Sequence, residues 1–164
     1  MAKTAIPILN TAIFTVVVPG TVAGYVPYRL LGGFSTPASG SLAWLGAAVF
    51  ALGAAVYFRC AWEFAVRGLG TPAPIAPTKF LVTTALHRYI RNPMYVGVAL
   101  VVLGQAALFH SLRLVEYAAL LLMTFHIFVV FYEEPTLRRQ FGDSYEEYRR
   151  AVPRWIPKLR GKQR

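Results

Sequence analysis

The chain has 164 residues, of which 56% are hydrophobic and only 15% are charged. An ordinary soluble domain has about a quarter of its residues charged, so this composition argues against a soluble globular protein. The formal net charge is +10. Because the basic residues flank apolar stretches and no soluble domain carries them, the charge does not indicate nucleic-acid binding.

Four apolar stretches follow one another along the chain, at 6–28, 42–58, 94–109 and 114–132. A helix needs roughly 17–25 apolar residues to cross a bilayer, and the third stretch is at the short end of this range. The stretches lack the polar face that a surface helix of a soluble protein shows. The sequence therefore predicts an all-α integral membrane helical bundle with about four transmembrane helices.

The first stretch is too long for the apolar part of a signal peptide. It contains Pro19 and Gly20, which suit a bent transmembrane helix, so we expect it to be retained. Cys60 is the single cysteine, which predicts neither an intrachain disulfide nor a thiolate metal cluster. We expect no metal site.

The basic residues are concentrated on one side of the predicted spans. One precedes the first stretch, four lie between the second and third, and nine follow the fourth, which makes fourteen of the seventeen. Arg59 lies within the second predicted span, and only Arg29 and Arg113 fall in the opposite loops. Lysine and arginine collect in cytoplasmic loops, so we expect a multi-pass protein with both termini cytoplasmic, in the plasma (inner) membrane if the source is bacterial. The basic belt would attract anionic lipid headgroups.

The third apolar stretch has a clear helix start. Asn92 is a good N-cap residue, and Pro93 suits the first helical position. The end of such a helix offers N–H groups and a partial positive charge to an anion. Arg88 and Arg91 lie beside it, and Tyr95 lies just inside. These residues predict a pocket for a carboxylate or a phosphate, or else a capped membrane helix with snorkelling arginines.

The fourth apolar stretch ends in carboxylates, Glu133 and Glu134, with His126 one to two turns inside. These carboxylates suit an ammonium group, or ion pairs with the arginines. We expect Pro135 to begin a new amphipathic helix that lies on the membrane surface and covers the pocket. Its apolar side would contain Leu137, Phe141, Tyr145 and Tyr148.

Arg59 and Glu63 lie four residues apart near the end of the second stretch, on one helix face. This spacing predicts either an ion pair within the helix or a polar lining for an entrance between the second and fourth helices.

The order and spacing of the polar residues resemble those of a known family. The motifs are Arg88-Tyr89-x-Arg91-Asn92-Pro93-x-Tyr95-x-Gly97, Glu133-Glu134-x-x-Leu137, Phe141-Gly142-x-x-Tyr145-x-x-Tyr148 and Val152-Pro153. Over Phe80 to Pro157 the chain resembles the isoprenylcysteine carboxyl methyltransferase and phospholipid methyltransferase group of integral membrane enzymes. Two departures stand out: Ala85-Leu86-His87 replaces a frequent Gly-Pro-Tyr, and Asn92 replaces a frequent histidine, so an acid or base role of that histidine does not transfer.

The resemblance implies methyl transfer from S-adenosyl-L-methionine to an amphiphilic, isoprenoid- or lipid-like acceptor at the cytoplasmic membrane face. The residues it places at the cofactor are His87, Tyr89, Arg91, Asn92, Pro93, Tyr95, Gly97, Glu133 and Glu134. The expected catalytic residues are Glu133, His87 and Arg91. The expected substrate residues are Arg59, Glu63 and His126.

On this interpretation residues 1–164 form a single membrane methyltransferase domain, with an N-terminal two-helix half at 1–67 and a C-terminal cofactor-binding half at 80–157. Two alternatives remain open. NADPH-dependent membrane reductases of the sterol-reductase type resemble the C-terminal motif, but they usually have a longer chain and a glutamate where this chain has Val98. A non-catalytic membrane scaffold would not need polar groups clustered at one corner.

Overall fold

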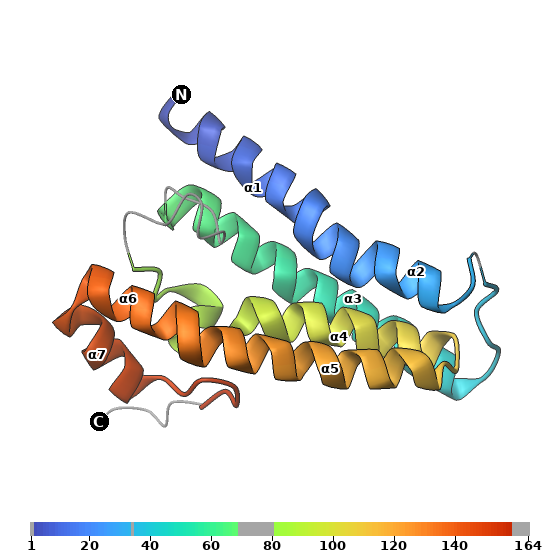
Figure 1. Ribbon diagram of the computed structural model, residues 1–164. Helices are drawn as coiled ribbons and strands as arrows, with labels where there is room; N and C mark the ends of the chain where they lie inside the picture. Colours follow the sequence, from blue (N-terminus) through green and yellow to red (C-terminus); the bar gives the residue numbers. More distant parts are fainter. Residues whose placement is uncertain (1, 34, 69–80, 159–164) are drawn as a thin grey trace.

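The computed structural model describes residues 2–33, 35–68 and 81–158. All regular elements in these ranges are helices, and they form long rods that pack along one another (Figure 1). The first rod consists of α1 (Ala2–Gly20), the π-helical turn η1 (Thr21–Tyr25) and α2 (Val26–Leu30). The second consists of α3 (Ser41–Glu63) and the π-helical turn η2 (Phe64–Gly68). After the short 3-10 helix η3 (Ala85–Arg88) come α4 (Pro93–Leu108), α5 (Leu112–Phe128), the π-helical turn η4 (Val129–Glu133), α6 (Glu134–Phe141) and α7 (Asp143–Ala151).

Three of the helical stretches are long and apolar enough to cross a membrane, namely Ile8–Leu30, Ser41–Val66 and Leu112–Phe141. The fourth apolar helix, Pro93–Leu108, has 16 residues. Large apolar side chains such as Trp44, at 79% exposed, cover the outside of the bundle, as expected for a surface in contact with lipid. The predicted all-α membrane bundle is confirmed.

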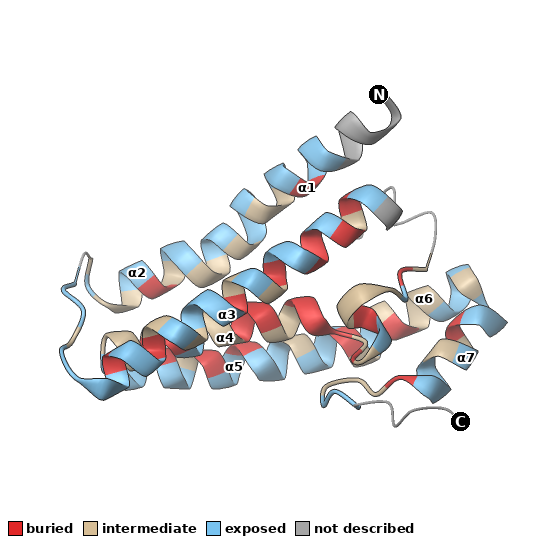
Figure 2. Cartoon of the chain, turned by 180° about the vertical axis from the view of Figure 1, so that it is seen from behind, coloured by how far each residue is buried: buried red, intermediate tan, exposed pale blue. Residues whose placement is uncertain are grey.

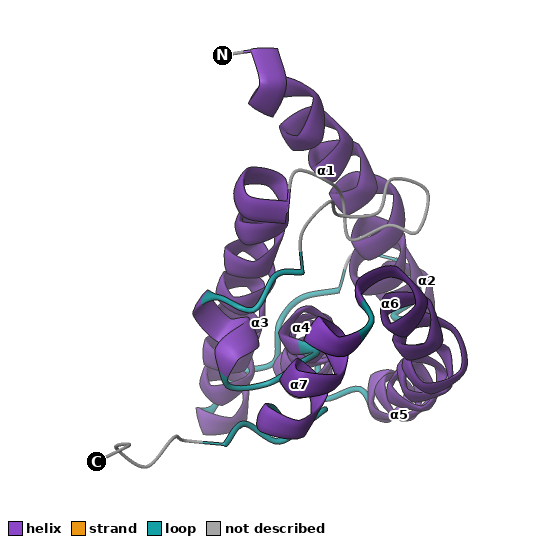
Figure 3. Cartoon of the chain, turned by 90° about the vertical axis from the view of Figure 1, so that its left-hand side faces the viewer, coloured by secondary structure: helices purple, strands orange, loops and turns teal. Residues whose placement is uncertain are grey.

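Helix α4 occupies the centre of the bundle, between α3 and α5 (Figure 3). Buried residues lie along α4 and on the side of α3 that faces it (Figure 2). The contact between the two helices depends on glycines: a Cβ atom added to Gly53 would lie 2.7 Å from the carbonyl oxygen of Gly97, and one added to Gly104 would lie 2.5 Å from the backbone nitrogen of Phe50. Small residues let backbones approach closely, and this contact replaces the hydrophobic driving force that helices lack in lipid.

The first rod is fixed to this core by two backbone carbonyl groups. Pro27 has no N–H to donate to the carbonyl of Ala23. In the π turn the Val26 N–H bonds to the carbonyl of Thr21, so it does not bond to the carbonyl of Val22. Side chains replace these donors: Gln105 on α4 donates to the Ala23 oxygen and Tyr117 on α5 donates to the Val22 oxygen, each at 2.8 Å. Unpaired carbonyl groups are costly in a membrane, so these two bonds attach α1 and α2 to the bundle.

Helix α6 begins at Glu134 with Pro135 in its first turn, so the expected helix is present, but it continues α5 through η4 without a break in the helical stretch. The Glu134 N–H bonds to the carbonyl of Val129, five residues back. Pro135 therefore falls in the first turn of α6, where its missing N–H costs little. The amphipathic segment is broken instead at Gly142, whose φ of 52° is unfavourable for other residues, so it forms two helices.

The N-terminus lies at the same end of the bundle as α6, α7 and η3 (Figure 1). We call this the polar end, because it contains the basic residues of α6 and α7 together with Arg88 and Arg91. Glu146 on α7 pairs with Arg138 on α6 at 2.6 Å, which joins the two short helices, and with Arg149 of its own helix at 3.3 Å.

Candidate functional site

The chain after α7 returns along the start of α4. We call residues 152–158 the C-terminal strap. The Arg91 N–H donates to the carbonyl of Pro153 at 2.9 Å, and the Lys158 N–H donates to the carbonyl of Tyr89 at 3.1 Å. Asn92 occupies the N-cap position of α4, but its side chain makes no capping bond. It donates instead to the carbonyl of Arg154, at 3.2 Å, so the amide fixes the strap.

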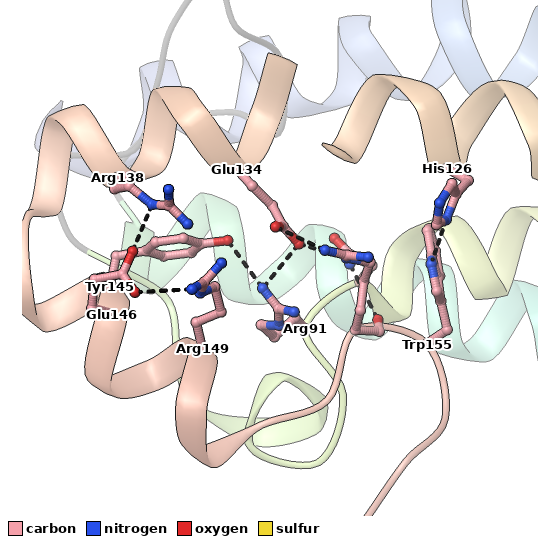
Figure 4. Close-up of polar contacts among 10 residues, drawn as sticks. Arg91, His126, Glu134, Arg138, Tyr145, Glu146, Arg149 and Trp155 are labelled. Atoms are coloured by element: carbon pink, nitrogen blue, oxygen red, sulfur yellow. Dashed lines mark hydrogen bonds and ion pairs between the residues drawn. The ribbon is translucent and has the colours of Figure 1, made fainter. Parts of the chain in front are cut away.

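Glu134 is the centre of an ion cluster at the polar end (Figure 4). Its carboxylate is 2.9 Å from Arg91 Nη1, and Arg154 donates to both oxygens, at 2.6 Å and 3.0 Å. Arg91 Nη1 also donates to the Tyr145 hydroxyl, at 3.2 Å. Glu134 is 6% exposed, and its charge is thus balanced by two guanidinium groups.

Glu133 points to a different partner from its neighbour. The Tyr95 hydroxyl on α4 donates to Glu133 Oε2 at 2.7 Å. In the part of the chain that the structure describes, neither Arg nor Lys pairs with this carboxylate. A partly buried charge without a counter-ion is unfavourable, so Glu133 is suited to a cationic ligand.

Two aromatic side chains pack against the ring of Tyr95. The ring centroid of Phe125 is 4.7 Å from that of Tyr95, and the ring of Trp155 is 6.5 Å away. Trp155 Nε1 donates to His126 Nδ1 at 3.1 Å (Figure 4). Trp155 of the strap therefore lies between Tyr95 and the predicted substrate residue His126 and contacts both.

A second polar cluster lies at the end of α3. Arg59 and Glu63 form the predicted ion pair, at 2.7 Å, and Thr84 donates to Glu63 at 2.8 Å. His87 is 4% exposed and packs edge-on against Phe64, with 5.3 Å between the ring centroids. Burial lowers the pKa of His87 to about 4, against a smaller opposing effect of Glu63, so this imidazole is neutral near pH 7. Its Nδ1 is buried, and no residue of the described part of the chain forms a hydrogen bond with it.

Three other predicted cofactor residues, Tyr89, Pro93 and Gly97, have identifiable contacts or positions in the fold. The guanidinium of Arg88 lies 4.6 Å from the ring centroid of Tyr89. Pro93 begins α4 as predicted. Gly97 faces α3, where an added Cβ atom would lie 2.9 Å from the carbonyl oxygen of Gly53, so its lack of a side chain serves helix packing.

Arg154 and Trp155 are not among the site residues predicted from the sequence. Both belong to the irregular strap, for which no periodicity exists. A tryptophan beside basic residues just after the last span is typical of the membrane interface, and this signal could have pointed to Trp155.

Comparison with known proteins bears on this arrangement. Residues 42–144 match a family described as phospholipid methyltransferase. The matched range extends from α3 to the first turn of α7 and includes both the Arg88–Gly97 motif and the two adjacent glutamates. The chain belongs to the phospholipid methyltransferase family. The family match ends before the strap.

A curated relative is Protein-S-isoprenylcysteine O-methyltransferase of Schizosaccharomyces pombe. It is 39% identical over 77 residues, which are 47% of this chain and 33% of the relative. The chain thus spans about a third of the length of the curated relative that it matches. No solved structure matches it.

Proposed function

We propose that this protein transfers a methyl group from S-adenosyl-L-methionine to an amphiphilic acceptor at the polar end of the bundle. One observation supports this most strongly: of the two adjacent glutamates, Glu134 is neutralised by Arg91 and Arg154, whereas the one partner of Glu133 among the described residues is the Tyr95 hydroxyl. A ligand ammonium group would balance the remaining charge.

The chemistry of the site fits this cofactor. Glu133 would hold the ammonium group of its methionine part. Arg91 Nε is buried and has no hydrogen-bond partner within the described ranges, and this N–H would donate to the methionine carboxylate. The cofactor, when bound, supplies an electrophilic methyl group on a sulfonium centre. The ring faces of Tyr95, Phe125 and Trp155 attract a positive charge and exclude water. Holding the two reactants in line supplies most of the rate enhancement in such a displacement.

The chemistry of the acceptor determines whether a base is needed. A carboxylate acceptor requires none, whereas an amine or a thiol loses a proton. Glu133 and the neutral His87 are the candidate proton acceptors. The roles expected for Arg59 and Glu63 at an entrance remain predictions.

We propose that the polar end faces the cytoplasm. Both the N-terminus and the basic helices α6 and α7 are at this end (Figure 1), and basic residues collect on the cytoplasmic side of membranes. The acceptor would enter laterally from the bilayer, because the outside of the bundle is apolar.

A methyl-transfer assay in nanodiscs tests this proposal. The purified protein receives radiolabelled S-adenosyl-L-methionine and acceptors that share one head group but have tails of increasing length. We expect transfer, with an apparent KM that falls as the tail lengthens. Each buried methylene should lower it by a factor that corresponds to at most about 0.8 kcal/mol of binding free energy. A parallel arm with NADPH tests the reductase alternative. Transfer to no acceptor, or oxidation of NADPH with loss of a substrate double bond, would overturn the proposal. Equal transfer to a tail-less head group would overturn lateral entry.

A further inference from the structure

The C-terminal strap runs back along the bundle after α7 and then turns (Figure 1). Both of its ends are fixed at the polar end. The Arg91 N–H donates to the carbonyl of Pro153, and the Lys158 N–H donates to the carbonyl of Tyr89. The turn between these two points consists of residues 155–157, which we call the wedge.

The depth of the wedge follows from its contact with α5. Trp155 Nε1 donates to His126 Nδ1 at 3.1 Å (Figure 4). His126 is fourteen residues after Leu112, the first residue of α5, which corresponds to about 21 Å along the helix axis. The hydrocarbon core of a bilayer is about 30 Å thick. A helix that enters this core at Leu112 or later leaves it beyond His126, so the wedge lies beside hydrocarbon. The neighbouring side chains Met123 and Ile127 are 56% and 50% exposed, and they continue this lipid-facing surface.

The wedge presents apolar side chains to its surroundings. Ile156 is 79% exposed, and Pro157 is also exposed. Arg154, just before the wedge, is bound to Glu134 at the polar end, and the exposed Lys158 follows the wedge. Tryptophan and basic residues in this order are typical of the region where acyl chains meet headgroups. The wedge is thus an apolar tip between two residues at the level of the headgroups, and lipid acyl chains fit it as a partner.

The backbone of the strap suits a shallow position in the membrane. Irregular backbone in hydrocarbon is costly because its N–H and carbonyl groups find no water. Pro153 and Pro157 have no N–H, and the carbonyl of Arg154 accepts a bond from Asn92 at 3.2 Å. These features reduce the number of groups that need a partner, and headgroup oxygens can reach the rest at a shallow depth.

We propose that the wedge inserts among the lipid acyl chains just below the headgroups at the polar end, and that this contact holds the strap against Tyr95. The ring centroid of Trp155 is 6.5 Å from that of Tyr95, so the wedge connects the membrane to the candidate site. This inference goes beyond the proposed function and does not depend on methyl transfer.

Fluorescence quenching of a single tryptophan tests the insertion. The chain has three tryptophans, so the full-length double variant Trp44→Phe, Trp62→Phe reports on Trp155 alone. The probes are nanodiscs of phosphatidylcholine brominated near the carboxyl end or near the methyl end of the acyl chain, and acrylamide in the water. Interfacial apolar groups reach about 5–10 Å into the boundary. We therefore expect the shallow bromines to quench Trp155 at least about twofold more than the deep ones, and acrylamide to quench it weakly.

A charge on the wedge tests its role in holding the strap. Ile156→Asp should lower the quenching by shallow bromines at least about twofold, because a carboxylate in hydrocarbon is costly. Hydrogen exchange at the N–H groups of Arg91 and Lys158 should become at least about fivefold faster, since these donors lose their strap contacts. Ala151→Asp is the matched control: Ala151 is exposed at the end of α7, and the same charge there should change neither measurement.

A protein that keeps only Trp62 controls for the state of the bundle. Trp62 is 57% exposed on α3, so brominated acyl chains should quench it equally with and without Ile156→Asp. Quenching of Trp155 by acrylamide and by neither brominated lipid would place the wedge in water. A Trp155 that no probe reaches would be covered by protein, including a second copy of this chain. Either result would overturn the proposal. Unchanged hydrogen exchange in Ile156→Asp would overturn the claim that the membrane holds the strap.

Discussion

Arg154 binds Glu134 through two hydrogen bonds, 2.6 Å from Nε to Oε1 and 3.0 Å from Nη2 to Oε2. This two-point contact joins the C-terminal strap to the end of the long rod that contains α5, and Arg91 binds the same carboxylate from the start of α4. Three segments distant in sequence thus meet at one buried glutamate. We infer that Glu134 holds the site together and that Glu133 is the residue available to a ligand.

Replacing Arg154 by glutamine should destabilise the protein by about 2 kcal/mol, the scale of a lost hydrogen bond to a charged group. The reason is that Glu134 would keep a single guanidinium partner while remaining buried. Denaturant unfolding in detergent measures the effect. Arg150→Gln is the control, since Arg150 is exposed on α7 and its replacement should change the unfolding free energy by less than about 0.5 kcal/mol. Equal effects of the two substitutions would contradict the role of Arg154.

His87 predicts a pH dependence of stability. Burial lowers its pKa to about 4, whereas an unfolded histidine titrates near 6.5. Between these values the unfolded chain binds more protons than the folded one, so stability rises with pH from about 4 to about 6.5 and this contribution is constant above. The full difference corresponds to about 3 kcal/mol.

Unfolding measured at pH 4.5, 5.5 and 7.5 tests this dependence. His87→Gln should reduce the slope below pH 6.5, while His110→Asn, in the exposed turn at the opposite end, should leave it unchanged. A His87→Gln variant with the wild-type slope would show that His87 does not cause the pH dependence.

Packing at Gly97 predicts a loss of stability in Gly97→Ala. The new methyl group would lie 2.9 Å from backbone atoms of both Gly53 and Tyr57, so α3 and α4 must separate, at a cost of about 1–3 kcal/mol. Gly24→Ala is the control, because its added Cβ would lie more than 4 Å from every described residue outside its own helical turn. If Gly97→Ala kept its stability but lost affinity for S-adenosylhomocysteine, Gly97 would contact the cofactor and helix packing would not be its main role.

The sequence was sufficient for the parts of the fold that depend on local pattern. Apolar length predicts the spans, and the position of Pro93 predicts the start of α4. Spacing by four residues predicts the ion pair of Arg59 with Glu63. Each of these features depends on residues that are close in the chain, so composition and spacing contain the information.

The remaining features depend on contacts between distant segments. The π turn before Pro135 joins α5 to α6, and Glu133 and Glu134 at this junction have different partners. Neighbouring positions in the sequence do not show which way a side chain points in such a turn. The strap has no periodicity, so its contacts through Arg154 and Trp155 appear only in three dimensions.

The proposed orientation predicts a labelling pattern in intact cells. Ser39 and Ser144 are exposed at opposite ends of the bundle, and the native Cys60 is buried. An impermeant thiol reagent added outside should label Ser39→Cys and not Ser144→Cys. Labelling of position 144 from outside would show that the protein has the opposite orientation in the membrane.

The most direct test of the central claim is calorimetric titration of S-adenosylhomocysteine into the purified protein and into two matched variants. We expect the wild type to bind it and Glu133→Gln to weaken binding by about 1–3 kcal/mol, with unchanged thermal unfolding. Glu134→Gln should instead lower the unfolding temperature, because it removes the carboxylate that joins Arg91 to Arg154. A folded Glu133→Gln variant that binds S-adenosylhomocysteine as tightly as the wild type would contradict the assignment of Glu133 to the cofactor.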